Sequence, residues 1–273
     1  MDLPALFSRF PIHTNSPVPV PTRFLVIQPT LWIAPPRDTD ALLSTDVECL
    51  KWQAYLALRG ITHIALRWDI SPEGALDARL PNLHLPDSSP HLLPPRSIPA
   101  WADARLGHVP DPLDGYRDQT AKDESHAWIA LLEGVVHAAL TLSQPVPHPG
   151  ILLRSDSRKT RALDTVLNPP PAPSTGFTSP LPPFGVNVDT SAVHSRYAEA
   201  VAALSDRLAT DKWFLGSQQP TALDALVFAY LHTLLHSSDS TRIQIARRPN
   251  LVAWERSVRS QVQTAFCLPP TAS

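Results

Sequence analysis

Cysteine and glycine are scarce in this sequence, and both shortages exclude common kinds of site. The 273 residues include two cysteines, Cys49 and Cys267, too few for a disulfide framework or a four-thiolate zinc site. No two of the nine glycines lie closer than eight residues apart. The glycine-rich phosphate and dinucleotide loops and the GxSxG nucleophile turn are therefore absent, since each needs glycines a few residues apart.

The sequence also lacks an excess of positive charge and a long apolar run. Lys and Arg number 23 against 25 Asp and Glu, a net charge of -2, which argues against a nucleic-acid-binding protein. The longest apolar run, Ala225 to Leu235, is interrupted by His232 and is shorter than the ~18 residues that cross a bilayer. The amino terminus has no signal-peptide pattern. We therefore expect no transmembrane segment, so any membrane association would be peripheral.

Proline, in contrast, is abundant, with 31 residues, about twice the usual ~5%. Because proline breaks helices and central strands, we expect two proline-rich segments outside the compact units, an N-terminal arm at 1–29 and a loop at 143–190. Each holds candidate partner-binding residues, although packing of the arm on its own domain and solvation of the loop are the simpler interpretations. These candidates are Phe7 and Phe10 in the arm and Arg154, Arg158, Lys159 and Arg161 in the loop.

Residues 30–110 have the pattern of a first compact unit. A short apolar strand, a helix capped by Ser44, Thr45 or Asp46 and a second strand predict a βαβ unit with parallel strands. A third strand, entered through Pro81, a short partner strand and a closing helix follow. The expected elements are a strand at Thr30–Ala34, a helix from its cap at 44–46 to about Arg59, and then Thr62–Trp68, Leu80–Leu85, His91–Leu93 and Ser97–Leu106.

Residues 111–273 have helical periodicity and predict a second, helical unit. One helix, opened by the Thr221-x-x-Asp224 pattern, is apolar almost all round and should be buried. In such a capping box the Thr hydroxyl accepts a backbone N–H three residues on, and the Asp carboxylate accepts the N–H of the cap residue. The expected helices are Asp118–Leu142, Tyr197–Leu208, Pro220–Leu235 and Pro249–Phe266.

This order of elements resembles the glutathione-transferase-like fold. In that fold an N-terminal thioredoxin-like α/β domain, here 30–110, is followed by an all-α helical bundle domain, here 111–273. Leu80-Pro81-Asn82-Leu83 resembles the cis-proline entry to the third strand of thioredoxin-like domains. Thr221 and Asp224 resemble the capping box of the buried helix in the transferase C-terminal domain.

Three segments are more specifically similar to the metaxin family. WFLGSQQPTALDALVFAYLHTLL, at 213–235, and VECLKWQAYLALRG, at 47–60, resemble its signature turn and helix and its first helix. The opening LFSRFPI is similar to fungal metaxin-like receptor subunits of the mitochondrial sorting and assembly machinery. The resemblance implies a non-enzymatic, peripheral protein on the cytosolic face of the mitochondrial outer membrane. Its implied partners are the β-barrel core subunit, a second metaxin-like subunit and β-barrel precursor proteins.

The chemistry of the sequence favours no catalytic, cofactor or metal site. Ser44 is the one candidate for the hydroxyl that stabilises a thiolate in glutathione transferases, and helix capping already explains it. Arg96-Ser97 replaces the acidic-Ser pair that holds glutathione, and Arg has the wrong charge to bind an ammonium group. His232 and His236 have metal-ligand spacing but lack the other ligands of a zinc site.

Two other functions stay open at this point, a divergent glutathione transferase and a cytosolic scaffold module with the same fold. Recognition of a β-barrel precursor could use strand addition to a sheet edge or a groove between the domains, and the sequence does not choose between them.

Overall fold

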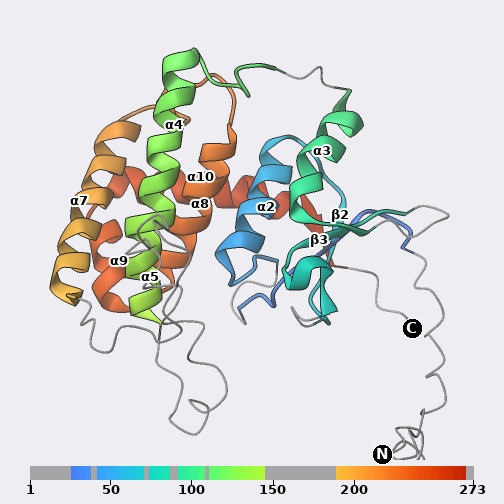
Figure 1. Ribbon diagram of the computed structural model, residues 1–273, viewed down its shortest axis with the longest axis horizontal. Coiled ribbons are helices and arrows are strands. Elements are labelled where there is room, and N and C mark those ends of the chain that lie inside the picture. Colours follow the sequence, from blue (N-terminus) through green and yellow to red (C-terminus); the bar gives the residue numbers. More distant parts are fainter. Residues whose placement is uncertain are drawn as a thin grey trace, which may run out of the picture.

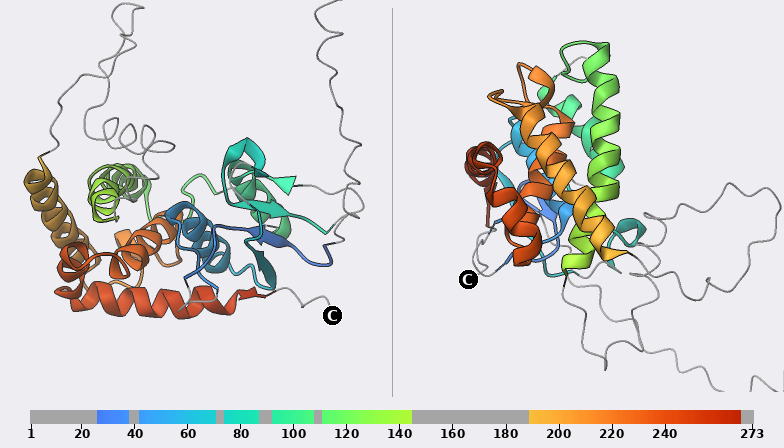
Figure 2. Two further views of the ribbon diagram at one scale, coloured as in Figure 1. Left: turned by 90° about the horizontal axis from the view of Figure 1, so that it is seen from below. Right: turned by 90° about the vertical axis from the view of Figure 1, so that its left-hand side faces the viewer.

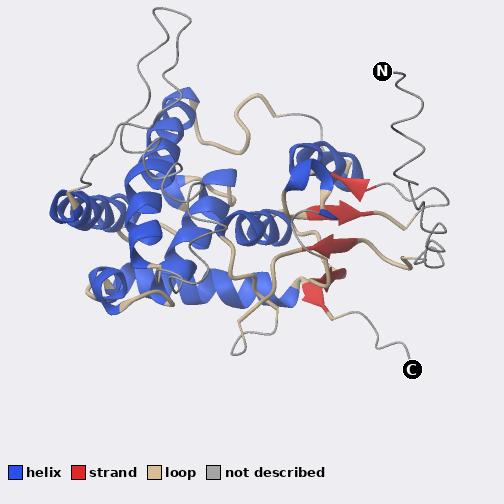
Figure 3. Ribbon diagram, turned by 60° about the horizontal axis from the view of Figure 1, so that its bottom comes forward, coloured by secondary structure: helices blue, strands red, loops and turns tan. Residues whose placement is uncertain are grey.

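The computed structural model describes residues 26–37, 42–70, 74–86, 92–107, 111–144 and 189–268. Short strands lie at one end of the molecule and a bundle of longer helices lies at the other (Figure 3). The sheet contains residues from both ends of the described chain, whereas the bundle is built from its second half.

The sheet is mixed, with the strand order β4-β3-β1-β2-β5. Strand β1 (Thr30–Trp32) is parallel to β2 (Ile64–Arg67), and helix α2 (Val47–Leu58) connects them, so the βαβ prediction is confirmed. Strand β3 (Asn82–His84) runs antiparallel to β1, and β4 (Leu92–Leu93) forms the expected antiparallel pair with β3.

Local chemistry sets the ends of the first helices. Asp46 is the N-cap of α2, and its carboxylate accepts the backbone N–H of Cys49 at 2.9 Å. Gly60 follows the helix with φ of +80°, a conformation that L side chains rarely adopt. The 3-10 turns η2 (Leu76–Ala78) and η3 (Pro95–Ser97) and helix α3 (Ile98–Leu106) complete this domain.

The second domain is helical, as its periodicity predicts. The long helix expected from Asp118 is continuous but contains a π-helical stretch, η4, between α4 and α5. The elements are α4 (Gln119–Leu131), η4 (Leu132–Val136), α5 (His137–Ser143), α7 (Thr190–Leu208), the 3-10 turn η5 (Phe214–Gly216), α8 (Ala222–Leu235), α9 (Asp239–Ala246) and α10 (Pro249–Thr264).

Helix α8 is the centre of the molecule. Every residue from Leu223 to Leu234 is buried, as expected for a helix that is apolar almost all round. Other helices of the bundle surround α8, and α2 of the first domain packs against it (Figure 1). The interface between the domains is therefore formed largely by α2 and α8.

The sequence pattern did not predict the last strand. After α10, Phe266–Cys267 forms β5, which is parallel to β2 and extends the sheet of the N-terminal domain. Two residues are too few for a recognisable alternation.

One helical stretch of the described residues, Gln119–Ser143, is long and apolar enough to cross a membrane by length and composition alone. Its best 18-residue window has a mean hydropathy of 1.3, and 33% of that window is buried. This segment is not an uninterrupted apolar run, because charged residues such as Glu133 break it, whereas an average over 18 residues tolerates them. Core helices of soluble proteins can pass the same test, so it is weak support for a span.

Candidate functional site

Ser44 lies in the loop between β1 and α2, where a transferase would need a free hydroxyl. It is 3% exposed, and both hydrogen-bonding roles of its hydroxyl are occupied. Oγ donates to the carbonyl of Ala34 at 2.9 Å and accepts the N–H of Asp46 at 3.2 Å. Its backbone N–H donates to the side chain of Gln53 at 3.0 Å. Ser44 thus closes the loop against α2.

Cys49, one turn into α2, is fully buried. Its sulfur accepts the N–H of Ala34 at 3.4 Å, which joins the helix to the end of β1. Burial, together with the nearby Asp46 carboxylate, raises the pKa of the Cys49 thiol far above its ordinary value. A thiol held in its neutral form is a poor nucleophile, so the structure assigns Cys49 to packing.

The Leu80–Pro81 peptide bond is cis, as the thioredoxin-like motif implies. The next side chain, Asn82, is fully buried and holds the preceding turn. Its Oδ1 accepts the N–H of Leu76 at 2.8 Å, and its Nδ2 donates to the carbonyls of Arg79 and Pro81. These bonds position the entry to β3 against η2.

The Arg96-Ser97 pair precedes α3, where the fold would hold the glutamyl group of glutathione. Ser97 is the N-cap residue of α3 but its side chain makes no capping bond. Arg96 is largely exposed and lies 3.8 Å from the carboxylate of Asp77. The Asp77 carboxylate is thus paired with Arg96, whose own positive charge does not suit an ammonium group.

The capping box of α8 is present, and the carboxylate of Asp224 also bonds to a residue outside the box. The carboxylate of Asp224 accepts three hydrogen bonds of 2.8 Å, from the N–H and the hydroxyl of Thr221 and from the N–H of Phe214. Burial raises the pKa of Asp224 to about 6, against the opposing effect of these donors. Asp224 thus joins the η5 turn to the central helix.

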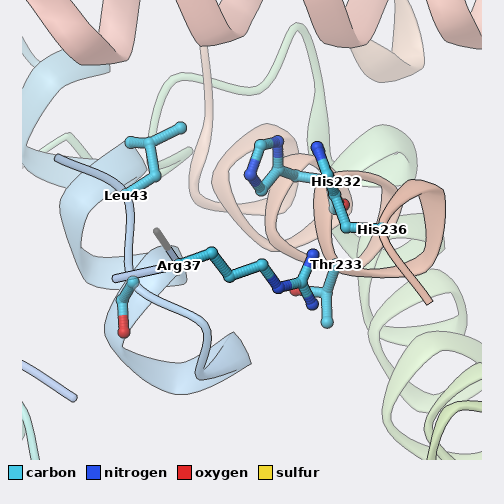
Figure 4. Close-up of a pocket in the computed structure, with 6 residues that line it drawn as sticks. Arg37, Leu43, His232, Thr233 and His236 are labelled. Atoms are coloured by element: carbon cyan, nitrogen blue, oxygen red, sulfur yellow. The ribbon is translucent and has the colours of Figure 1, made fainter. Parts of the chain in front are cut away.

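A small pocket lies where the β1–α2 loop meets the end of α8. In Figure 4 the side chain of Arg37 reaches across the interface toward Thr233. The cavity volume is about 10 Å³, enough for roughly one water molecule. This is far below the ~300 Å³ of a small-molecule site. The pocket is lined by Arg37, Leu43, Ser44, His232, Thr233 and His236.

The two histidines expected at metal-ligand spacing have protein partners. Nδ1 of His232 lies 2.7 Å from the carboxylate of Glu255 on α10, and both side chains are buried. Nδ1 of His236 lies 2.7 Å from the carbonyl of His232. Among the described residues, no group of three or more His, Cys, Asp and Glu could hold a metal ion. The sequence pattern did not indicate the partner, Glu255, because the two paired residues are 23 positions apart and lie on different helices.

The candidate partner-binding residues lie outside the described residues. These are Phe7, Phe10, Arg154, Arg158, Lys159 and Arg161. The predicted N-terminal arm, before residue 26, and nearly all of the predicted 143–190 loop lie outside them too.

Comparison with known proteins supports the fold and part of the resemblance. Residues 197–258 match the family "Glutathione S-transferase, C-terminal domain". A 64-residue segment, 22% of this chain, is 42% identical to "Metaxin-1 homolog" of Caenorhabditis briggsae, of which it covers 20%. The match therefore spans about a fifth of that relative.

Two solved structures share the architecture. A GST-like protein from Pseudomonas syringae has a TM-score of 0.51 at 13% identity, covering 89% of this chain and 71% of that one. Gtt2 from Saccharomyces cerevisiae has a TM-score of 0.50 at 12% identity, covering 86% and 98%. The chain thus has the glutathione-transferase-like fold, and identities this low carry nothing about its activity.

Proposed function

We propose that this chain is a metaxin-like, non-enzymatic subunit of the machinery that assembles β-barrel proteins in the mitochondrial outer membrane. In this proposal it is a peripheral receptor subunit on the cytosolic face. It binds the barrel core subunit and a second metaxin-like subunit, and it helps to receive and release β-barrel precursors. The observation that carries the proposal is the 42% identity over 64 residues to the metaxin-1 homolog.

The geometry of the β1–α2 loop supports the non-enzymatic part of the proposal. Thiolate stabilisation needs a hydroxyl or thiol free to interact with the substrate. The hydroxyl of Ser44 is hydrogen-bonded to Ala34 and Asp46, and burial raises the pKa of the Cys49 thiol. The neighbouring pocket has room for about one water molecule, far less than a small-molecule site needs.

The test is affinity purification of the tagged full-length chain from mitochondria, combined with fractionation. We expect the chain in the mitochondrial fraction, released by carbonate, and a β-barrel membrane protein in the eluate. A tagged, unrelated peripheral protein of the same membrane is the control. Recovery of no β-barrel protein would reject the proposal, and a wholly cytosolic chain would favour a scaffold module instead.

A divergent glutathione transferase is the second candidate, because residues 197–258 match the transferase C-terminal domain family. Conjugation of glutathione to a chloronitrobenzene electrophile distinguishes the two. We expect no activity above background in the wild type. Activity that is lost in Ser44→Ala and kept in Thr45→Ala would establish the enzyme, since Thr45 offers a neighbouring hydroxyl that donates to Pro35.

A further inference from the structure

The last part of the chain has a charge pattern unlike the rest. From Ser240 to the end there are five arginines and one carboxylate, Glu255, whereas the preceding residues hold 18 Lys and Arg against 24 Asp and Glu. Glu255 is 2% exposed and is engaged with His232, so it contributes little negative potential to the surface. The near-zero net charge of the whole chain therefore conceals a strong asymmetry.

The structure places these arginines on the solvent side of two adjacent helices, α9 and α10. Arg242, Arg247 and Arg256 are exposed, and Arg248 and Arg259 are half-exposed. Arg242 forms an ion pair of 2.6 Å with Asp239, itself largely exposed. Among the described residues, no carboxylate lies within ion-pair distance of the other four arginines. We call these five residues the arginine face.

The arginine face is held on a fixed support. On the opposite side of α10, Leu251, Val258 and Val262 are buried, and Trp254 donates from Nε1 to the carbonyl of Lys212 at 2.9 Å. In both views of Figure 2, α10 lies along one margin of the molecule, and no described element lies outside it. Its 16 residues give an outer side about 24 Å long.

One large apolar side chain is exposed among these arginines. Ile243, on the outer side of α9 between Arg242 and Arg247, is 43% exposed. Protein–protein interfaces usually have an apolar centre enriched in aromatic residues, and Arg is enriched in them as well. The arginine face lacks such a centre, because Ile243 is the one exposed large apolar side chain of α9 and α10 among the described residues. A group of basic side chains on a helix surface is instead the pattern that binds anionic lipid head groups.

We infer that the arginine face is a docking surface for anionic phospholipid head groups. Guanidinium groups bind phosphate oxygens through two parallel hydrogen bonds, and a group of four to eight basic residues is enough for this recognition. Ile243 reaches the boundary between head groups and acyl chains. The excess of acidic residues in the rest of the chain orients the protein with this face toward a negative surface. The arginine face provides a membrane contact for the proposed subunit, but its assignment as a lipid-binding surface does not rest on the proposed function.

The experiment is flotation of the purified full-length chain with vesicles of phosphatidylcholine, with and without phosphatidylinositol. We expect binding to the anionic vesicles at low salt and loss of binding at high salt, because salt screens exposed charges. Arg256→Gln combined with Arg259→Gln should weaken binding about 25-fold, roughly fivefold for each arginine, since each basic residue near such a surface contributes ~1 kcal/mol.

The matched control is Arg79→Gln combined with Arg196→Gln, which removes the same charge from exposed positions elsewhere. It should bind within about twofold of the wild type, since neither arginine belongs to the arginine face. Equal weakening of vesicle binding by both pairs of substitutions would show that binding depends on net charge alone. That outcome would overturn the inference. Equal binding to neutral vesicles, or none to anionic ones, would also overturn it and leave an acidic protein as the partner of this face. No mitochondrial protein is in the assay, so its failure is separate from failure of the proposed function.

Discussion

At the scale of single residues, the carboxylate of Asp224 does more than cap a helix. Two of its hydrogen bonds come from Thr221, of which the one from the backbone N–H belongs to the capping box, and the third holds the backbone of Phe214. Because buried donors without partners are costly, the η5 turn and the start of α8 depend on this one side chain. The capping box could be predicted from the Thr221-x-x-Asp224 spacing, but the bond to Phe214 could not, since it spans a turn of irregular backbone.

We predict that Asp224→Ala lowers the free energy of unfolding by about 3 kcal/mol, because three buried donors lose their acceptor. Asp118→Ala is the matched control. Asp118 caps α4 at a half-exposed position, where it accepts the N–H of Ala121 at 2.7 Å, and its loss should cost clearly less. Urea unfolding of both variants measures the difference, and equal losses would contradict the prediction.

The raised pKa of Asp224 predicts a pH dependence with a definite sign. Between its ordinary value of 3.8 and about 6, the folded protein holds a proton that the unfolded chain has released. The contribution of Asp224 to stability is thus complete below about pH 4 and is lost as the pH rises through about 6. The unfolding free energy of the wild type, relative to Asp224→Asn, should fall from pH 4 to pH 7. A difference that rises with pH would show that the three donors outweigh burial.

At the scale of elements, α10 has two different sides. Its inner side packs on the bundle and is fixed by Trp254 and by the Glu255 contact to α8. Its outer side has Arg256 and Arg259 of the arginine face. The periodicity of the sequence predicts that α10 is a helix, but only its packing against α8 reveals that Glu255 is hidden and that the remaining charge of the outer side is positive.

We predict that Glu255→Ala destabilises the protein by about 3 kcal/mol, because it removes the carboxylate that contacts the buried His232. Glu255→Gln, which retains an acceptor of the same shape, should cost clearly less. Glu199→Ala on α7 is the exposed control and should change stability by under ~0.5 kcal/mol. Thermal or urea unfolding tests the order, and equal effects of the Ala and Gln changes would refute it.

At the scale of the whole molecule, the two domains share one core. Helix α2 packs against α8 and α10, and after α10 the chain returns to the first domain as β5. Phe266 of this strand is 6% exposed and belongs to the same apolar cluster as Leu31 and Leu50. Because the core is continuous, we expect both domains to unfold together.

We predict that Phe266→Ala lowers the unfolding free energy by about 3 kcal/mol and keeps a single transition. The control, Cys267→Ala, changes the next residue of the strand, which is only partly buried, and should cost less than ~1 kcal/mol. Far-UV circular dichroism and tryptophan fluorescence, recorded on the same samples, measure cooperativity. Separate midpoints for the two signals would show that the domains unfold independently.

The sequence by itself determined the elements whose signals are local. The βαβ unit, the buried helix α8 and its capping box follow from periodicity, turn residues and caps, which act over a few residues. Only the tertiary structure decided the strand β5, the engagement of the Ser44 hydroxyl, the pairing of His232 with Glu255 and the side on which the arginines emerge. These depend on contacts between residues far apart in the chain, because burial is a property of the assembled core and not of any segment.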